Sequence, residues 1–134
     1  MSDRTAILNL TNAQLLALNS APPTVVPAPG ANKLIQVLAW FLALDNAAGL
    51  YVGGGSIQLF EGTTAQGSGC AATFLTGDAS ASKASYFTGA ITGVAAMVNQ
   101  PLTVKNNTAD FTGGNAANKA TLTVTYRIMS TLPL

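Results

Sequence analysis

The longest apolar run of the chain lies between Lys33 and Asp45. Its eleven residues, from Leu34 to Leu44, include a single polar side chain, Gln36. The run is too short to cross a bilayer, which takes about 20 residues, and as a soluble helix it would have no polar face. The pattern therefore predicts a strand that is buried on both faces and around which the other strands pack.

Hydrophobic and polar residues alternate strictly near the C-terminus. The apolar positions are Leu122, Val124, Tyr126 and Ile128, and the polar ones are Thr121, Thr123, Thr125 and Arg127. Such alternation, rich in β-branched residues, predicts a strand with one buried and one solvated face. A weaker alternation over residues 56–61 places Ile57, Leu59 and Glu61 on one side of another strand.

The N-terminal segment combines a short apolar stretch with a helix-start signal. Residues 5–10 predict a strand or an arm, and we expect residues 1–10 to be an N-terminal arm that contacts a partner. Thr11 followed by Gln14 is a capping-box pattern, which predicts one short helical turn. Prolines on both sides of Thr24–Val26 predict a brief strand at a sheet edge.

The middle of the chain is rich in turn residues and less regular. We expect a loop over 62–69, a short strand over 71–75, polar loops over 76–85 and 108–118, and either a loose strand or a short helix over 90–99. With seven to nine predicted strands, the chain is expected to be all-β. It should form a single-domain, jelly-roll-like β-sandwich over residues 1–134, with at most one short helix near the N-terminus.

Charge is scarce. Only 8% of the residues are charged and the net charge is +1, against about 25% charged residues in an ordinary globular domain. Little electrostatic repulsion would keep copies apart, so we expect a member of a protein assembly. The six basic residues are scattered singly, which argues against nucleic-acid binding.

The residue types that carry catalysis and metal binding are few. Histidine is absent, and the single cysteine, Cys70, has no partner for an intrachain disulfide or a zinc site. The five carboxylates are expected to be solvated; the alternative is a hydrolase dyad of Glu61 and Asp110, which chain folding would have to bring together. We therefore expect no enzyme, no catalytic residue, no cofactor and no metal.

Several segments resemble small virion proteins of tailed bacteriophages, in particular capsid decoration (cement) proteins and the knobs of head fibres. The segments that carry the resemblance are Leu15–Asn19, Pro23–Lys33, the apolar run, Tyr51–Gly55 before Ile57–Leu59, and the closing strand Leu122–Met129. The resemblance implies a jelly-roll-like sandwich that binds the capsid exterior as a dimer or trimer and clamps neighbouring major capsid proteins.

This resemblance sets the expected partners and location. The partners are the major capsid protein and copies of the chain itself, without nucleic acid or membrane. The location is the virion, after synthesis in the host bacterial cytoplasm, as the N-terminus shows no signal peptide. The residues expected at the interface are Ile7, Leu8, Leu10 and Trp40, although Trp40 is equally well explained by core packing.

One alternative function uses the same fold. The chain would be a receptor-binding head-fibre or tail-tip protein that adheres to the host cell surface. In that case the polar loops over 76–85 and 108–118 would contact a host glycan. An uncharacterised hydrolase is disfavoured because the sequence offers no obvious general base.

Overall fold

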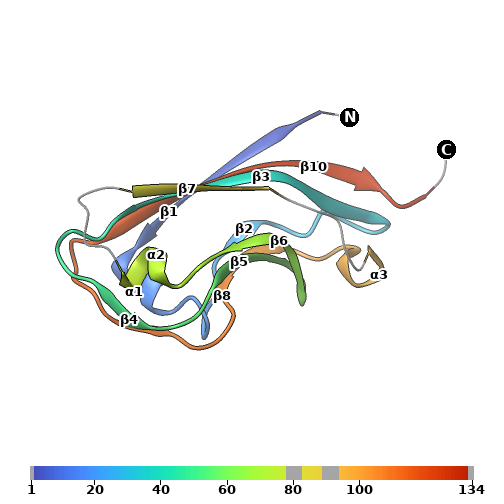
Figure 1. Ribbon diagram of the computed structural model, residues 1–134. Coiled ribbons are helices and arrows are strands. Elements are labelled where there is room, and N and C mark those ends of the chain that lie inside the picture. The colour runs from blue at the N-terminus through green and yellow to red at the C-terminus, as the bar shows by residue number, and fades with distance from the viewer. Residues whose placement is uncertain (1, 78–82, 89–93, 133–134) are drawn as a thin grey trace.

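Two antiparallel sheets of four strands face each other (Figure 1). The computed structural model describes residues 2–77, 83–88 and 94–132. The first sheet, called here the β1 sheet, has the order β1 (Arg4–Thr11), β10 (Lys119–Ser130), β3 (Lys33–Asp45) and β7 (Lys83–Thr88). The second, the β2 sheet, has the order β2 (Thr24–Val26), β8 (Leu102–Asn106), β5 (Ile57–Glu61) and β6 (Thr64–Cys70).

A third, two-stranded sheet lies at one end of the sandwich (Figure 1). It pairs β4 (Tyr51–Gly53) with β9 (Phe111–Gly113), and the rings of Tyr51 and Phe111 pack with their centroids 6.0 Å apart. This strand pair closes the end of the core, since both rings are buried.

The strand order is that of a jelly roll. When β4 and β9 are set aside, the β1 sheet contains the first, eighth, third and sixth strands of the chain. The β2 sheet contains the second, seventh, fourth and fifth. This interleaving of two sheets is the double Greek key of jelly rolls. The predicted all-β, jelly-roll-like sandwich is confirmed, and the described residues form ten strands, one more than the upper end of the predicted range.

β3 and β10 form the centre of the β1 sheet. They pair from Lys33–Ser130 to Asp45–Lys119, with a register shift between Thr125 and Tyr126. The alternation predicted for β10 is confirmed, because Leu122 and Val124 are fully buried while the intervening threonines are not. Trp40, Leu42 and Leu44 of β3 extend the same core.

The prediction that β3 is buried on both faces is wrong for its C-terminal half. From Ala39 onward the burial alternates, and the Phe41 side chain is 41% exposed. The sequence hides this alternation because the outward positions are also apolar.

The helices are short and more numerous than expected. The predicted turn is α1 (Asn12–Leu16), where Thr11 and Gln14 form the capping box. Two further single-turn helices are α2 (Thr73–Thr76) and α3 (Val94–Met97), so the expected limit of one helix is wrong. The strand predicted over 71–75 is therefore replaced largely by α2. The ambiguous segment over 90–99 contains α3, and its residues 90–93 lie outside the described ranges.

Three other expectations need correction. The loop predicted over 62–69 is mostly strand β6, which forms by pairing with β5 and has no hydrophobic alternation of its own. The predicted N-terminal arm is strand β1 from Arg4 onward, paired with β10 along its whole length. The polar segment over 108–118 contains β9, whereas residues 78–82 of the other predicted loop lie outside the described part of the chain. No helix in the described ranges is long and apolar enough to cross a membrane.

Candidate interaction surface

An uncharged surface covers the outer side of the β1 sheet. Because side chains alternate along a strand, every second residue of β1, β10 and β3 points away from the β2 sheet. Cross-strand pairing aligns these residues in rows, one of which runs from Ile7 through Thr123 to Phe41. The surface, called here the outer face, consists of Thr5, Ile7, Asn9, Ala39, Phe41, Ala43, Thr121, Thr123 and Thr125.

Two large hydrophobic side chains are exposed on the outer face. Ile7 is 66% exposed and Phe41 is 41% exposed. They lie in the same row on either side of Thr123, surrounded by threonine, alanine and asparagine. A patch of this composition loses no charge hydration when it is covered, and its apolar side chains gain from burial.

Charged residues lie at the two ends of the outer face. At one end, Lys119 and Asp45 are opposite each other on β10 and β3. At the other end, the guanidinium of Arg127 forms an ion pair with the carboxylate of Asp3. The nine residues between these ends carry no charge, so contacts made there depend little on salt.

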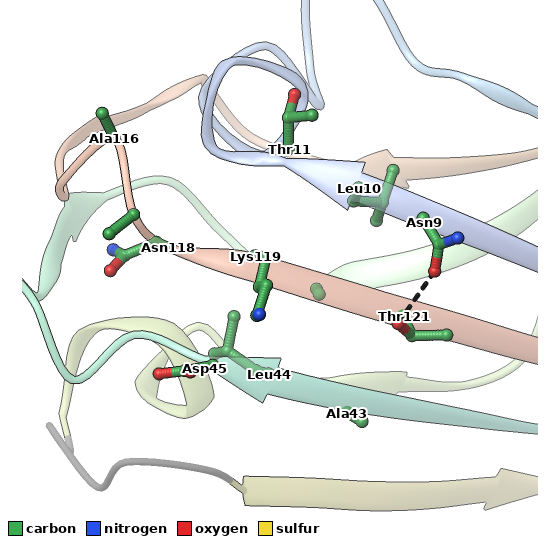
Figure 2. Close-up of a pocket in the computed structure, with 12 residues that line it drawn as sticks. Asn9, Leu10, Thr11, Ala43, Leu44, Asp45, Ala116, Asn118, Lys119 and Thr121 are labelled. Carbon is green, nitrogen blue, oxygen red and sulfur yellow. Dashed lines mark hydrogen bonds between the residues drawn. The ribbon is translucent and has the colours of Figure 1, made fainter.

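A cavity of about 520 Å³ opens at the Lys119 end (Figure 2). Residues of β1, β3 and β10 and of the segment 116–118 line it. The Thr121 hydroxyl donates a hydrogen bond to the Asn9 Oδ1 atom at 3.0 Å, drawn as the dashed line in Figure 2. No hydrogen bond or ion pair within the described residues joins Lys119 to Asp45, which leaves the ammonium group available to a ligand.

The structure separates the four residues expected at the interface. Ile7 lies on the outer face with most of its side chain in solvent. Leu8 points inward and is half-buried, while Leu10 and Trp40 are 2% and 1% exposed in the core. Leu10 and Trp40 therefore have no surface to offer a partner in this conformation, because they fill the space between the sheets.

Phe41 is the surface residue that sequence reasoning missed. The aromatic residue predicted at the interface is Trp40, but alternation along β3 turns Trp40 inward and Phe41 outward. Only the strand register distinguishes the two residues, because Trp40 pairs with the inward Val124 and Phe41 pairs with the outward Thr123.

The proposed carboxylate dyad is absent. Glu61 and Asp110 lie at opposite ends of the β5–β8 pair, because Glu61 is opposite Leu102, whereas Asp110 follows the far end of β8 at Asn106. Asp110 accepts hydrogen bonds from the Ser20 hydroxyl and from two backbone N–H groups, and the Ser20 hydroxyl is the main cause that lowers the pKa of Asp110. Asp110 therefore fixes the position of Asn19 and Ser20, which follow α1.

Glu61 is not the solvated carboxylate that the sequence suggested. Its side chain is fully buried. Burial raises the pKa of Glu61 to about 7, against the opposing effect of the hydrogen bond from the Ile35 N–H. Within the described residues no three His, Cys, Asp or Glu side chains gather where they could hold a metal ion. Cys70 is 1% exposed, as expected of a small buried thiol.

Comparison with protein-family models gives no match for this chain, and comparison with curated proteins gives none either.

Proposed function

We propose that this chain is a virion structural protein of a tailed bacteriophage. It binds the outer surface of the capsid as a homo-oligomer and stabilises contacts between neighbouring major capsid proteins. The observation that carries the proposal is the uncharged outer face, with Ile7 and Phe41 exposed in one row of the β1 sheet.

The composition of the outer face suits permanent contact with protein. Exposed apolar patches rimmed by polar residues mark protein-interaction sites, and charged residues are depleted at the centres of such interfaces. Here the charges of Lys119, Asp45, Arg127 and Asp3 lie at the ends, while the centre is threonine, alanine and two large hydrophobic residues.

Binding of this kind stabilises a shell without any chemical step. A protein that binds only the intact lattice shifts the equilibrium toward that lattice. Many identical copies on a symmetric shell, each with modest affinity, add up to a large total effect when copies are linked in oligomers. The proposal therefore assigns no catalytic residue and no cofactor to the chain.

The test uses capsids that lack this protein. Purified protein should co-sediment with them and raise the temperature at which they release DNA. The double substitution Ile7→Lys and Phe41→Lys should weaken binding by at least tenfold, because two charges would have to be buried without partners.

The matched control is Val52→Lys. Val52 is 62% exposed on β4, away from the outer face. This variant should bind capsids like the unmodified protein. Equal binding by all variants, with circular dichroism showing that each is folded, would contradict the proposal.

The second candidate function is adhesion to the host surface, and the cavity in Figure 2 favours it. Amide, hydroxyl, carboxylate and ammonium groups from Asn9, Thr11, Asp45 and Lys119 line one cavity, a donor and acceptor set that suits a hydroxyl-rich ligand such as a glycan. A glycan array and binding to whole host bacteria test this candidate, with Asp45→Ala expected to abolish any signal. Binding to capsids but to no glycan would rule it out.

A further inference from the structure

The free edge of β1 differs from both edges of the β2 sheet. β2 is three residues long and flanked by prolines, and β6 contains Gly67 at a positive φ of 64° beside a register shift. Short length, proline, bulges and lysine are the devices by which proteins keep sheet edges from pairing with other chains.

β1 has none of these devices, and its one charged residue is Arg4 at its start. It is eight residues long, and from Thr5 to Thr11 it contains no charge, proline or glycine. Among the described residues it pairs with β10 on one side only, so from Thr5 to Leu10 its other side presents backbone N–H and C=O groups that no neighbouring strand pairs. Figure 1 shows its N-terminal half extending above the rest of the sandwich.

The core between the two sheets is also partly exposed along the β1 edge. Ala6 and Leu8 point inward but are only half-buried, because β2 is too short to cover them. A cavity of about 210 Å³ opens near the start of β1, where Arg4, Tyr126 and Ile128 of one sheet face Val26 of the other, with Lys33 also in its lining. A partner at the β1 edge would therefore gain both backbone hydrogen bonds and apolar contact.

We infer that the free edge of β1 pairs with β1 of a second copy, antiparallel and around a two-fold axis, to join two four-stranded sheets into one of eight strands. The inference deepens the proposed homo-oligomer by naming its partner surface. Two-fold symmetry brings a surface against its own copy, so charged residues there would repel. The uncharged stretch from Thr5 to Thr11 meets that condition.

The alternation of side chains restricts the register. Directly opposed residues in an antiparallel pair share a face, so outward residues must meet outward residues. Pairing centred on Ile7 places Ile7 against its copy and Thr5 opposite Asn9. It also places Ala6 opposite Leu8 and Arg4 opposite Leu10, so no like charges meet. This register covers Ile7, which has the largest exposed fraction of the large hydrophobic side chains in the described residues.

The test measures the purified chain in the absence of capsids. Sedimentation equilibrium should give a dimer, and Ile7→Lys should shift it to monomer by placing two charges side by side on the axis. Phe41→Lys should remain dimeric, since Phe41 lies two strands away from the edge. A monomer at all concentrations would overturn the inference, and so would a trimer, because three-fold symmetry cannot pair a strand with its own copy.

A cross-linking measurement covers the case in which Ile7→Lys fails to fold. Under mild oxidation Ile7→Cys should form a disulfide-linked dimer, whereas Val52→Cys should not. Equal cross-linking of both variants would contradict the β1–β1 pairing centred on Ile7. Capsid binding is measured separately: a monomer that binds capsids refutes this inference alone, and a dimer that ignores capsids refutes the proposed function alone.

Discussion

The carboxylate of Glu61 in β5 accepts a hydrogen bond from the backbone N–H of Ile35 in β3, with 2.6 Å between Oε1 and N. This bond joins the two sheets of the sandwich through its core, since Ile35 belongs to the β1 sheet and Glu61 to the β2 sheet. The other oxygen, Oε2, is buried and has no hydrogen-bond partner among the described residues. An ionised carboxylate in this position is costly, which is why burial raises the pKa of Glu61.

Stability should fall as pH rises through the range in which Glu61 ionises. The pKa of Glu61 is about 7 in the folded protein and has a usual value of 4.5, so between these values the folded state binds more protons than the unfolded state. The stabilisation that the folded protein gains from the protonated Glu61 is complete below pH 4.5 and lost above pH 7. The effect is about 3 kcal/mol at most, from about 1.4 kcal/mol per pKa unit.

The measurement is urea unfolding between pH 4 and pH 8, compared with Glu61→Gln. Glutamine keeps an acceptor for the Ile35 N–H but cannot ionise, so the variant should lose this pH dependence and be more stable than the unmodified protein at pH 8. Parallel pH profiles for the two proteins would show that Glu61 is not the responsible group.

The register of β10 predicts a large loss of stability for one substitution and a small loss for its neighbour. Val124→Asp should lower the free energy of unfolding by about 3 kcal/mol or more, because it buries a charge without a partner in the core. Thr123→Asp should cost less than about 1 kcal/mol, since Thr123 faces outward. Urea midpoints measure both, and similar losses would mean that the register is wrong.

Thr123 also connects stability to the proposed function. It lies between Ile7 and Phe41 in the outer face. Thr123→Asp should therefore give a folded protein with reduced capsid binding, and this result would separate the binding surface from the fold.

Two adjacent glycines should differ in their tolerance of alanine. Gly53 and Gly54 both have positive φ, 75° and 69°, so alanine at either position costs about 1 kcal/mol of backbone strain. A Cβ at Gly53 would meet open space, whereas one at Gly54 would overlap the Phe111 ring and lie 2.6 Å from the Asn106 amide.

Gly54→Ala should therefore cost about 2 kcal/mol more than Gly53→Ala, within the range for overpacked cores. The Phe111 ring cannot move away freely because it packs on Tyr51. Thermal unfolding of the two variants checks the difference, and equal melting temperatures would contradict it.

The capping box at the start of α1 should contribute measurably to stability. The Thr11 Oγ1 atom accepts a hydrogen bond from the Gln14 N–H at 3.3 Å, and the Gln14 side chain accepts one from the Thr11 N–H at 2.9 Å. Thr11→Ala should cost about 1 kcal/mol, and Thr11→Ser should be nearly neutral because it keeps the hydroxyl. A loss of equal size in both variants would point to the missing methyl group.

The elements predicted from sequence are those whose local pattern agrees with their environment. β10 alternates between the core and solvent, and Thr11 and Gln14 cap a helix without help from distant residues. β6 has no such pattern, since its strand conformation comes from pairing with β5 across a register shift. α2 is four residues long, little more than one helical turn, so its sequence shows no repeated helical pattern and predicts a strand instead.

The candidate surface was only partly predictable for a related reason. The alternation that placed Glu61 beside Ile57 and Leu59 was visible in the sequence, but carboxylates are rarely buried, so exposure was the natural expectation. In β3 the inward and the outward positions are both apolar, so the sequence pattern does not distinguish Trp40 from Phe41. The pairing with β10, which is a tertiary contact, decides which of the two faces the core.

The adjacency of the first and last strands has a consequence for synthesis. β10 lies between β1 and β3, so the β1 sheet has no centre until residues 119–130 have left the ribosome. Closing contacts between residues more than 100 positions apart is slow, and it can begin only after β10 has been synthesised. A chain that ends before residue 119 lacks the strand on which β1 and β3 both depend, so it cannot reach the folded state.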